Sequence, residues 1–205
     1  SFAPKRVLKP QTVWSLASDD FSAPLQKVLD AAQTLLNVQA ETISFTRDTE
    51  TLEQWRQAYV TMGAAEAWAL HGDWILEHCP TFSAPIAARW AQARAVTPEQ
   101  AQLAQQKVAD IRTHVRSLLG DDAIAIVPSA AGLAPLQNET GEAVDQLRMR
   151  TMHITCIAGI SGVCQVSIPF KNKAGVPVGV SLIGPAGSDL ALIQLATALS
   201  KPLET

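Results

Sequence analysis

The stretch that most constrains the fold of this chain is DAIAIVPSA, residues 122–130. Its centre is continuously apolar, whereas a strand with one solvated face alternates apolar and polar residues. A short continuous apolar run is typical of a strand that is buried on both faces. Such a strand needs helices above and below it, so this stretch predicts an α/β architecture in which a sheet is flanked by helices.

The remaining sequence supplies helices and strands for that architecture. We expect helices over residues 22–37, 51–79, 83–96, 98–119, 144–157 and 188–201, and strands over residues 6–8, 41–46, 163–170 and 176–185. The last two strands are joined by the short turn KNKAG, so they should be antiparallel and the sheet mixed. No repeat or linker divides the chain, and we expect residues 1–205 to form a single domain.

Several helix boundaries are predicted from capping residues. The expected N-terminal caps are Ser22, Asp48 or Thr49, and Thr97, and Gly120 is the expected stop of the helix that Thr97 begins. Pro24 and Pro98 fall in first turns, where a missing N–H has no consequence for the helix.

Composition excludes several classes of protein. Hydrophobic residues make up 47% of the chain and charged residues 17%, with a net charge of −3, which fits a well-buried fold and offers no basic surface for nucleic acid. No apolar run approaches the roughly 20 residues of a membrane-spanning helix, and the N-terminus has no signal-peptide pattern. Cys79, Cys156 and Cys164 have no metal-binding spacing, so we expect free thiols in a cytoplasmic protein.

No motif for metal, nucleotide or nucleophile chemistry is complete in this sequence. His71 and His78 lie two helical turns apart without a third ligand, and the histidines are interpreted as solvent-facing or capping residues. The glycines of GVPVGVSLIGPAG do not form a phosphate loop, and GxSxG is absent. Ser161 and Ser167 follow His153 and could be read as a Ser/His pair, but packing or backbone hydrogen bonding is the better interpretation. We therefore expect no metal and no cofactor.

Two stretches near the C-terminus carry a resemblance to a known family. TCIAGISGVCQVSIPF, followed by GVPVGVSLIGPAGSDLALIQLATAL, resembles the C-terminal end of the amidase signature family, and is closest to indoleacetamide-hydrolase-like members. The strand DAIAIVPSAAGLAP and the helix YVTMGAAEAW also resemble family elements. The family usually has Asn three residues before Gly162 and Pro two residues after it, where this chain has Gly159 and Cys164. The fold implied is the C-terminal part of the amidase signature fold.

The resemblance also implies what this chain lacks. The family's catalytic Lys, cis-Ser and nucleophilic Ser belong to an N-terminal half that has no counterpart here, so no residue of this chain is predicted to be catalytic. The helix before Gly159 lies near the acyl pocket in family members. Met152, Thr155, Ile157 and Gly159 are therefore candidates for lining the substrate pocket, with Met152 the best of them and ordinary core packing the alternative for each.

The resemblance implies a function for a larger assembly. The chain is expected to be the C-terminal portion of a serine amidase, which hydrolyses a small-molecule carboxamide to a carboxylic acid and ammonia. Its partner would be the N-terminal catalytic half, on the same or a separate chain, and a homodimer could cover the same surface. The alternatives are a non-catalytic binding or scaffold module and, more weakly, a hydrolase that uses Ser161 or Ser167.

Overall fold

The structure is a computed structural model and describes residues 2–200. Its centre is a five-stranded sheet in the order β2-β1-β3-β5-β4. Strand β1 (Arg6–Pro10) runs parallel to β2 (Ala40–Ile43) and to β3 (Ala123–Pro128). Strand β5 (Pro177–Gly184) is antiparallel to β3 and to β4 (Cys164–Lys171). The predicted antiparallel hairpin and mixed sheet are confirmed.

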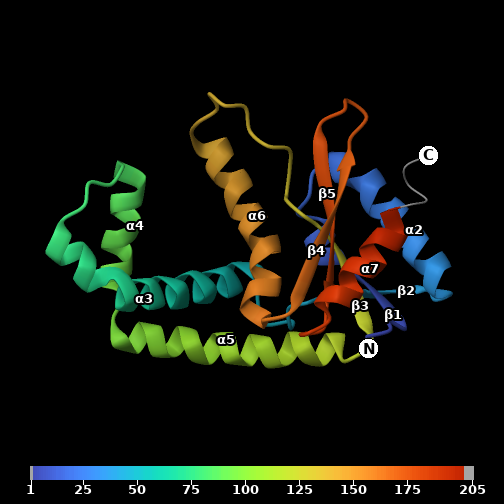
Figure 1. Ribbon diagram of the computed structural model, residues 1–205, viewed down its shortest axis with the longest axis horizontal. Helices are drawn as coiled ribbons and strands as arrows, with labels where there is room; N and C mark the ends of the chain where they lie inside the picture. Colours follow the sequence, from blue (N-terminus) through green and yellow to red (C-terminus); the bar gives the residue numbers. More distant parts are fainter. Residues whose placement is uncertain (1, 201–205) are drawn as a thin grey trace.

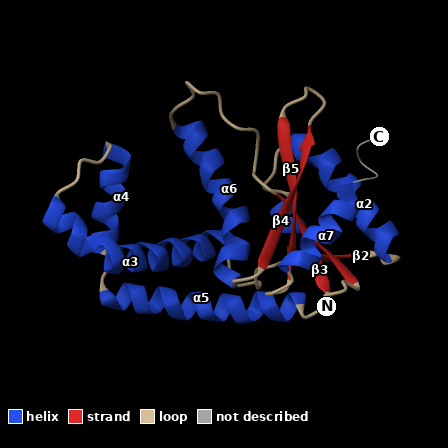
Figure 2. Ribbon diagram, viewed as in Figure 1, coloured by secondary structure: helices blue, strands red, loops and turns tan. Residues whose placement is uncertain are grey.

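Helices cover both faces of this sheet (Figures 1 and 2). One face is covered by α2 and α7, and the other by α3, α5 and α6. The helical elements are α1 (Gln11–Trp14), the 3-10 turn η1 (Asp19–Phe21), α2 (Ser22–Leu36), α3 (Leu52–His78), α4 (Ala84–Ala95), α5 (Pro98–Leu119), α6 (Glu142–Ser161) and α7 (Asp189–Ser200). Lys201, the last residue of the predicted final helix, lies outside the described residues. The α/β fold predicted from the sequence is confirmed.

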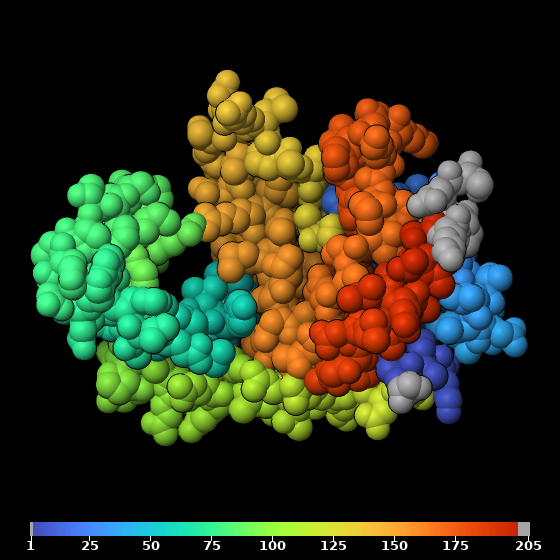
Figure 3. Space-filling view, viewed as in Figure 1, coloured from blue at the N-terminus to red at the C-terminus, as the bar shows by residue number. Residues whose placement is uncertain are grey.

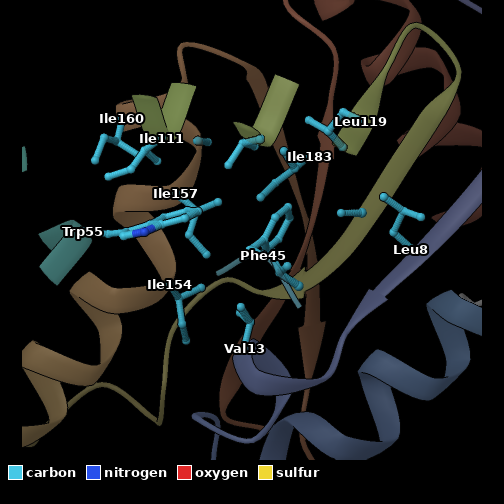
Figure 4. Close-up of a cluster of buried hydrophobic side chains, with 14 of the residues drawn as sticks. Leu8, Val13, Phe45, Trp55, Ile111, Leu119, Ile154, Ile157, Ile160 and Ile183 are labelled. Atoms are coloured by element: carbon cyan, nitrogen blue, oxygen red, sulfur yellow. The ribbon is translucent and has the colours of Figure 1, made fainter. Parts of the chain in front are cut away.

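The core divides into two layers because β3 faces both of them. All six residues of β3 are buried. Ala125 and Val127 pack into the layer under α3, α5 and α6, whereas Ile124 and Ile126 pack into the layer under α2 and α7. Figure 4 shows the first layer, where Trp55 lies among isoleucines of α5 and α6. This alternation explains why the strand is apolar at every position.

Two helices begin at capping boxes. The Thr97 side chain accepts from the N–H of Gln100, as the predicted cap should, and Gln100 reciprocates. The same pairing starts α3 at Thr51 with Gln54, so the predicted caps Asp48 and Thr49 are wrong. The sequence contains Thr51-x-x-Gln54, which is the capping-box pattern. This pattern sets the start of α3, and Asp48, three residues earlier, does not cap the helix.

Two other predicted boundaries differ from the structure. Ser22 is the first residue of α2 and its side chain caps nothing, because the 3-10 turn before it leads directly into the helix. Helix α6 continues past Ile157 to Ser161 and stops at Gly162, whose φ of 58° is the left-handed conformation that glycine adopts easily. Arg116 of α5 holds that end, with its Nε 2.9 Å from the Ser161 carbonyl oxygen.

The second half of α3 and all of α4 form a helical arm that extends away from the sheet (Figure 1). Trp90 of α4 is the centre of an aromatic cluster, with ring centroids 6.4 Å from Trp68, 6.0 Å from His71 and 6.2 Å from Phe82. Trp74 stacks on His78 at 5.2 Å. Among the described residues, no helix is both long and apolar enough to cross a bilayer.

Candidate functional site

A hollow of about 800 Å³ opens between α6, the loop after β3 and the β4–β5 hairpin. In Figure 3 the surface is notched between α6, drawn in gold, and the hairpin, drawn in orange. Most side chains around it are apolar, and they come from four elements: Phe21, Leu133, Val144, Leu147, Met152, Ile168 and Val178. A pocket of this size and lining is typical of small-molecule sites.

The floor of the hollow depends on close backbone packing at Gly179 of β5. A Cβ built on Gly179 would overlap the Oγ of Ser129. Ser129 is held there because its N–H donates to the Gly179 carbonyl oxygen at 3.0 Å. The glycine in the sequence VPVGV therefore lets the loop after β3 approach the hairpin. A side chain at this position would require Ser129 to move.

Hydroxyl groups fix the loop and the hairpin on either side of the hollow. The Oγ1 of Thr151 on α6 accepts from the N–H of Ala131 at 3.1 Å, so it ties the loop to the helix. The Oγ of Ser167 on β4 lies 2.7 Å from the Oγ of Ser181 on β5. Ser129, Thr151 and Ser167 all line the hollow, and their hydroxyls are among the polar groups that a ligand would meet there.

The four predicted pocket residues occupy different environments. Met152 lines the hollow. Thr155 is exposed on α6, outside the residues that line the hollow. Ile157 is fully buried in the core beside Trp55 (Figure 4). Gly159 faces α3, where an added Cβ would lie 2.9 Å from the Tyr59 hydroxyl. The structure therefore brings Met152 to the hollow and separates the other three from it, and substrate contact for each stays a prediction.

An ionic cluster joins α3 to α6 behind this region. Glu53 accepts from Arg56 at 2.6 and 2.8 Å and lies 2.7 Å from the Nε2 of His153. The Arg56 guanidinium, and then the His153 and Gln57 side chains, lower the pKa of Glu53 to about 2. His153 was interpreted as solvent-facing or capping, and its bond to Glu53 corrects that interpretation. His114 likewise makes a tertiary contact, with its Nε2 2.9 Å from the Phe45 carbonyl oxygen.

Cys156 lies beside this cluster but is not activated by it. Cys156 is buried, and burial raises the pKa of its thiol to about 12, although the Arg56 charge acts in the opposite direction. A thiol with that pKa is not a nucleophile near neutral pH. Cys79 is exposed and Cys164 is half-buried, and all three thiols are free.

The two serines that were weighed as nucleophiles have no catalytic partner among residues 2–200. Ser161 is completely buried and its Oγ has no hydrogen-bond partner, so the expected backbone bond is absent and packing alone accounts for it. Ser167 bonds to Ser181, and no histidine bonds to either residue. The part of the chain that the structure describes also contains no group of three or more His, Cys, Asp or Glu side chains arranged to hold a metal ion.

Sequence reasoning missed several residues of the hollow. Ser129, Thr151 and Arg148 line it, yet none was singled out. Ser129 follows the buried strand directly, at the strand's carboxyl end, where ligand sites of α/β folds collect, and this position was a usable signal. Arg148 lies on the same face of α6 as Met152, because it precedes Met152 by four residues. The spacing from Met152 could have found Arg148.

The Amidase family model matches residues 12–193, a span that includes the hollow and most residues of both core layers. Over 130 residues the chain is 32% identical to Amidase 1 of Arabidopsis thaliana, covering 63% of this chain and 31% of that protein. It is 28% identical over 134 residues to the chloroplastic Outer envelope protein 64 of the same plant, covering 65% and 23%. The chain thus spans about a third or less of the curated relatives it matches.

A solved structure supports the same fold. A bacterial aryl acylamidase of the amidase signature enzyme family superimposes with a TM-score of 0.75 at 16% sequence identity. The match covers 98% of this chain and 44% of that one. At this identity the likeness concerns the fold, and nearly all of this chain corresponds to less than half of that longer chain.

Proposed function

The chain belongs to the amidase signature family, and on that premise we propose that it is the C-terminal portion of a serine amidase. The reaction is hydrolysis of a carboxamide to a carboxylic acid and ammonia. The observation that carries the proposal is the family match over residues 12–193, which leaves only short ends of the chain unassigned. Relatives whose names include Amidase 1 and aryl acylamidase support amide hydrolysis at the level of the family.

In this proposal the catalytic residues and the substrate pocket come from different parts of the amidase. The family's Ser, cis-Ser and Lys would lie on the larger part of the relatives that this chain does not span. There the nucleophilic Ser attacks the amide carbonyl, the C–N bond breaks, and ammonia leaves with a proton relayed from the Lys. Water then hydrolyses the acyl-enzyme. This chain would contribute the hollow, with Met152 on its wall and Thr151 and Ser129 as polar contacts.

The test begins with the intact native protein. Its mass and N-terminal sequence establish whether the Lys and the Ser-rich segment accompany this chain, on the same polypeptide or on a companion. Ammonia release is then measured with a panel of carboxamides. We expect hydrolysis, and we expect it to fall by at least a thousandfold when the upstream nucleophilic Ser is replaced by Ala. A protein that carries no such Ser and releases no ammonia would overturn the proposal.

A variant within this chain tests the role of the hollow. Met152→Trp adds bulk to its wall, so kcat/KM for amides with large acyl groups should fall about tenfold while small amides are affected less. The control is Met149→Trp, because Met149 is on the same helix and does not line the hollow. Equal effects of both variants would remove Met152 from the pocket.

A second candidate function is binding without catalysis, acting as a scaffold. One observation favours it: the chain matches the chloroplastic Outer envelope protein 64 at 28% identity, and the name of that relative describes a location and no hydrolase. A native protein without the upstream Ser and Lys, which nevertheless forms a stable complex with another protein, would support this candidate. Amide hydrolysis that depends on the upstream Ser would exclude it.

A further inference from the structure

The hollow has an uneven distribution of charge. Eighteen residues line it, and a single one of them, Arg148, carries a charge at neutral pH. Neither aspartate nor glutamate is present in the lining, and the other polar groups are hydroxyls and backbone amides. An apolar hollow that contains one cation and no acid favours a ligand with an apolar body and one negative charge.

Arg148 is also free to bind such a ligand. Within residues 2–200, no carboxylate lies within ion-pair distance of its guanidinium, although six other contacts between Arg or Lys and a carboxylate form in the same part of the chain. It is exposed on α6, one turn before Met152, so its side chain reaches the rim while Met152 contributes to the wall. The five N–H donors of an arginine match a carboxylate in a two-pronged geometry.

The opposite side of α6 provides a contrast. Arg150 is exposed on the same helix, but it lines a different depression together with Glu142 and Asp145. Glu142 and Asp145 thus line the Arg150 depression and not the hollow. Asp145 precedes Arg148 by three residues, but within residues 2–200 no ion pair joins the two side chains. A carboxylate that approaches Arg148 meets an apolar wall, whereas one that approaches Arg150 meets two like charges.

We infer that the hollow is a binding site for an apolar carboxylate, whose anionic group pairs with Arg148 and whose body lies against Met152, Leu133 and Val178. The inference rests on the proposed function where it concerns the reaction: the preferred substrate is an amide whose apolar acyl group carries a carboxylate at its far end. Binding of an apolar carboxylate by itself requires no catalysis, so the two ideas can be tested separately.

The first experiment measures binding of 4-ethylbenzoate, which has no amide, to the full-length native protein by calorimetry. Arg148→Gln should raise its Kd about five- to tenfold, and the wild-type affinity should fall with added salt because the rim is solvated. Arg148→Lys keeps the charge and should retain part of the affinity. Arg150→Gln is the matched control and should change little. Unfolding curves check that each variant folds, as expected for an exposed side chain.

The second experiment measures hydrolysis of a matched pair of amides, phenylacetamide and 4-carboxyphenylacetamide. The wild-type protein should favour the carboxylated amide in kcat/KM, and Arg148→Gln should reduce that preference about five- to tenfold. Hydrolysis of both amides with no effect of Arg148→Gln on the preference would overturn the substrate assignment and leave the proposed function standing. Arg148-dependent binding of 4-ethylbenzoate in a protein that hydrolyses no amide would overturn the proposed function and support the carboxylate-binding site. An equal loss of 4-ethylbenzoate affinity in the Arg148→Gln and Arg150→Gln variants would overturn the carboxylate-binding site.

Discussion

The two halves of helix α3 differ in burial, although they belong to one continuous helix. Near its N-terminal end, Trp55 is fully buried between α5 and α6, and its indole N–H donates to Glu50 at 3.3 Å. Near its other end, Trp74 is 52% exposed and Leu70 is 76% exposed. The same residue types thus form the core at one end of the helix and the surface of the arm at the other.

This comparison shows that position in the fold decides what an apolar residue contributes. The N-terminal half of α3 packs against α5 and α6 and closes one layer of the core. The C-terminal half has α4 as a neighbour, and the aromatic cluster around Trp90 remains half-buried.

Trp55→Ala should have the largest effect on stability. Removal of a fully buried indole leaves a cavity that the surrounding isoleucines cannot fill, and it leaves Glu50 without one of its donors. The free energy of unfolding should fall by about 3–5 kcal/mol, measured by urea denaturation. A loss below about 1 kcal/mol would mean that this half of α3 is not part of the cooperative core.

Trp90→Ala should act on the arm alone. Trp90 contacts Trp68, His71 and Phe82, and these contacts join α4 to α3. We expect a loss of about 1–2 kcal/mol in local stability, because the cluster is already partly solvated. Hydrogen exchange should accelerate in Ala84–Ala95 while the amides of β3 stay protected. Faster exchange in β3 as well would show that the arm and the sheet unfold as one unit.

Glu53→Gln tests the junction where α3 enters the core. The pKa of Glu53 is lowered from 4.5 to about 2, so its ionised form stabilises the folded state above about pH 4.5, and this contribution is lost as the pH falls toward 2. Because the side chain is 38% exposed, solvent screening reduces the effect to about 1 kcal/mol. The difference between wild type and variant should be present at pH 7 and shrink below pH 4.5. Glu66→Gln, at an exposed position on the same helix, is the control, and an equal pH dependence there would contradict the prediction.

Leu70→Gln should have the smallest effect. Leu70 is 76% exposed, so the substitution removes little buried area and should change the free energy of unfolding by less than about 0.5 kcal/mol. The same measurement as for Trp55→Ala applies. A loss of several kcal/mol would mean that this side of the arm is covered in the native protein, by a second copy or by another part of the assembly.

Much of the fold was predictable because its signals are local. The apolar run of β3 and the Thr97-Pro98 start of α5 both have short-range causes, and both are confirmed. The Thr51 cap was equally local, and it was missed because Asp48 and Thr49 were preferred over the Thr-x-x-Gln pattern. The parallel pairing of β1 with β2 and β3 depends on residues far apart in the chain, and no local pattern contains it.

The candidate site was less predictable. Met152 was named from the family resemblance, and it lines the hollow. Ile157 lies on the same helix but points into the core, since a helix turns its successive residues to different sides, and the resemblance did not say which side faces the hollow. The four-residue spacing from Met152 places Arg148 on the same face of α6, but only the structure shows that no aspartate or glutamate lines the hollow beside it.

The pairing of β1 with β3 has a consequence for the order of events at the ribosome. Arg6 pairs with Ala123, so the first strand of this segment emerges more than a hundred residues before its inner neighbour. At a synthesis rate of about 5–20 residues per second, β3 emerges on the order of ten seconds after β1. Until then Val7 and Leu8 lack the strand that buries them. During that time β1 has β2 as its available partner, and the nascent two-stranded ribbon is marginally stable. A chaperone, or an upstream domain that has already folded, would have its largest effect on the yield of native protein in this interval.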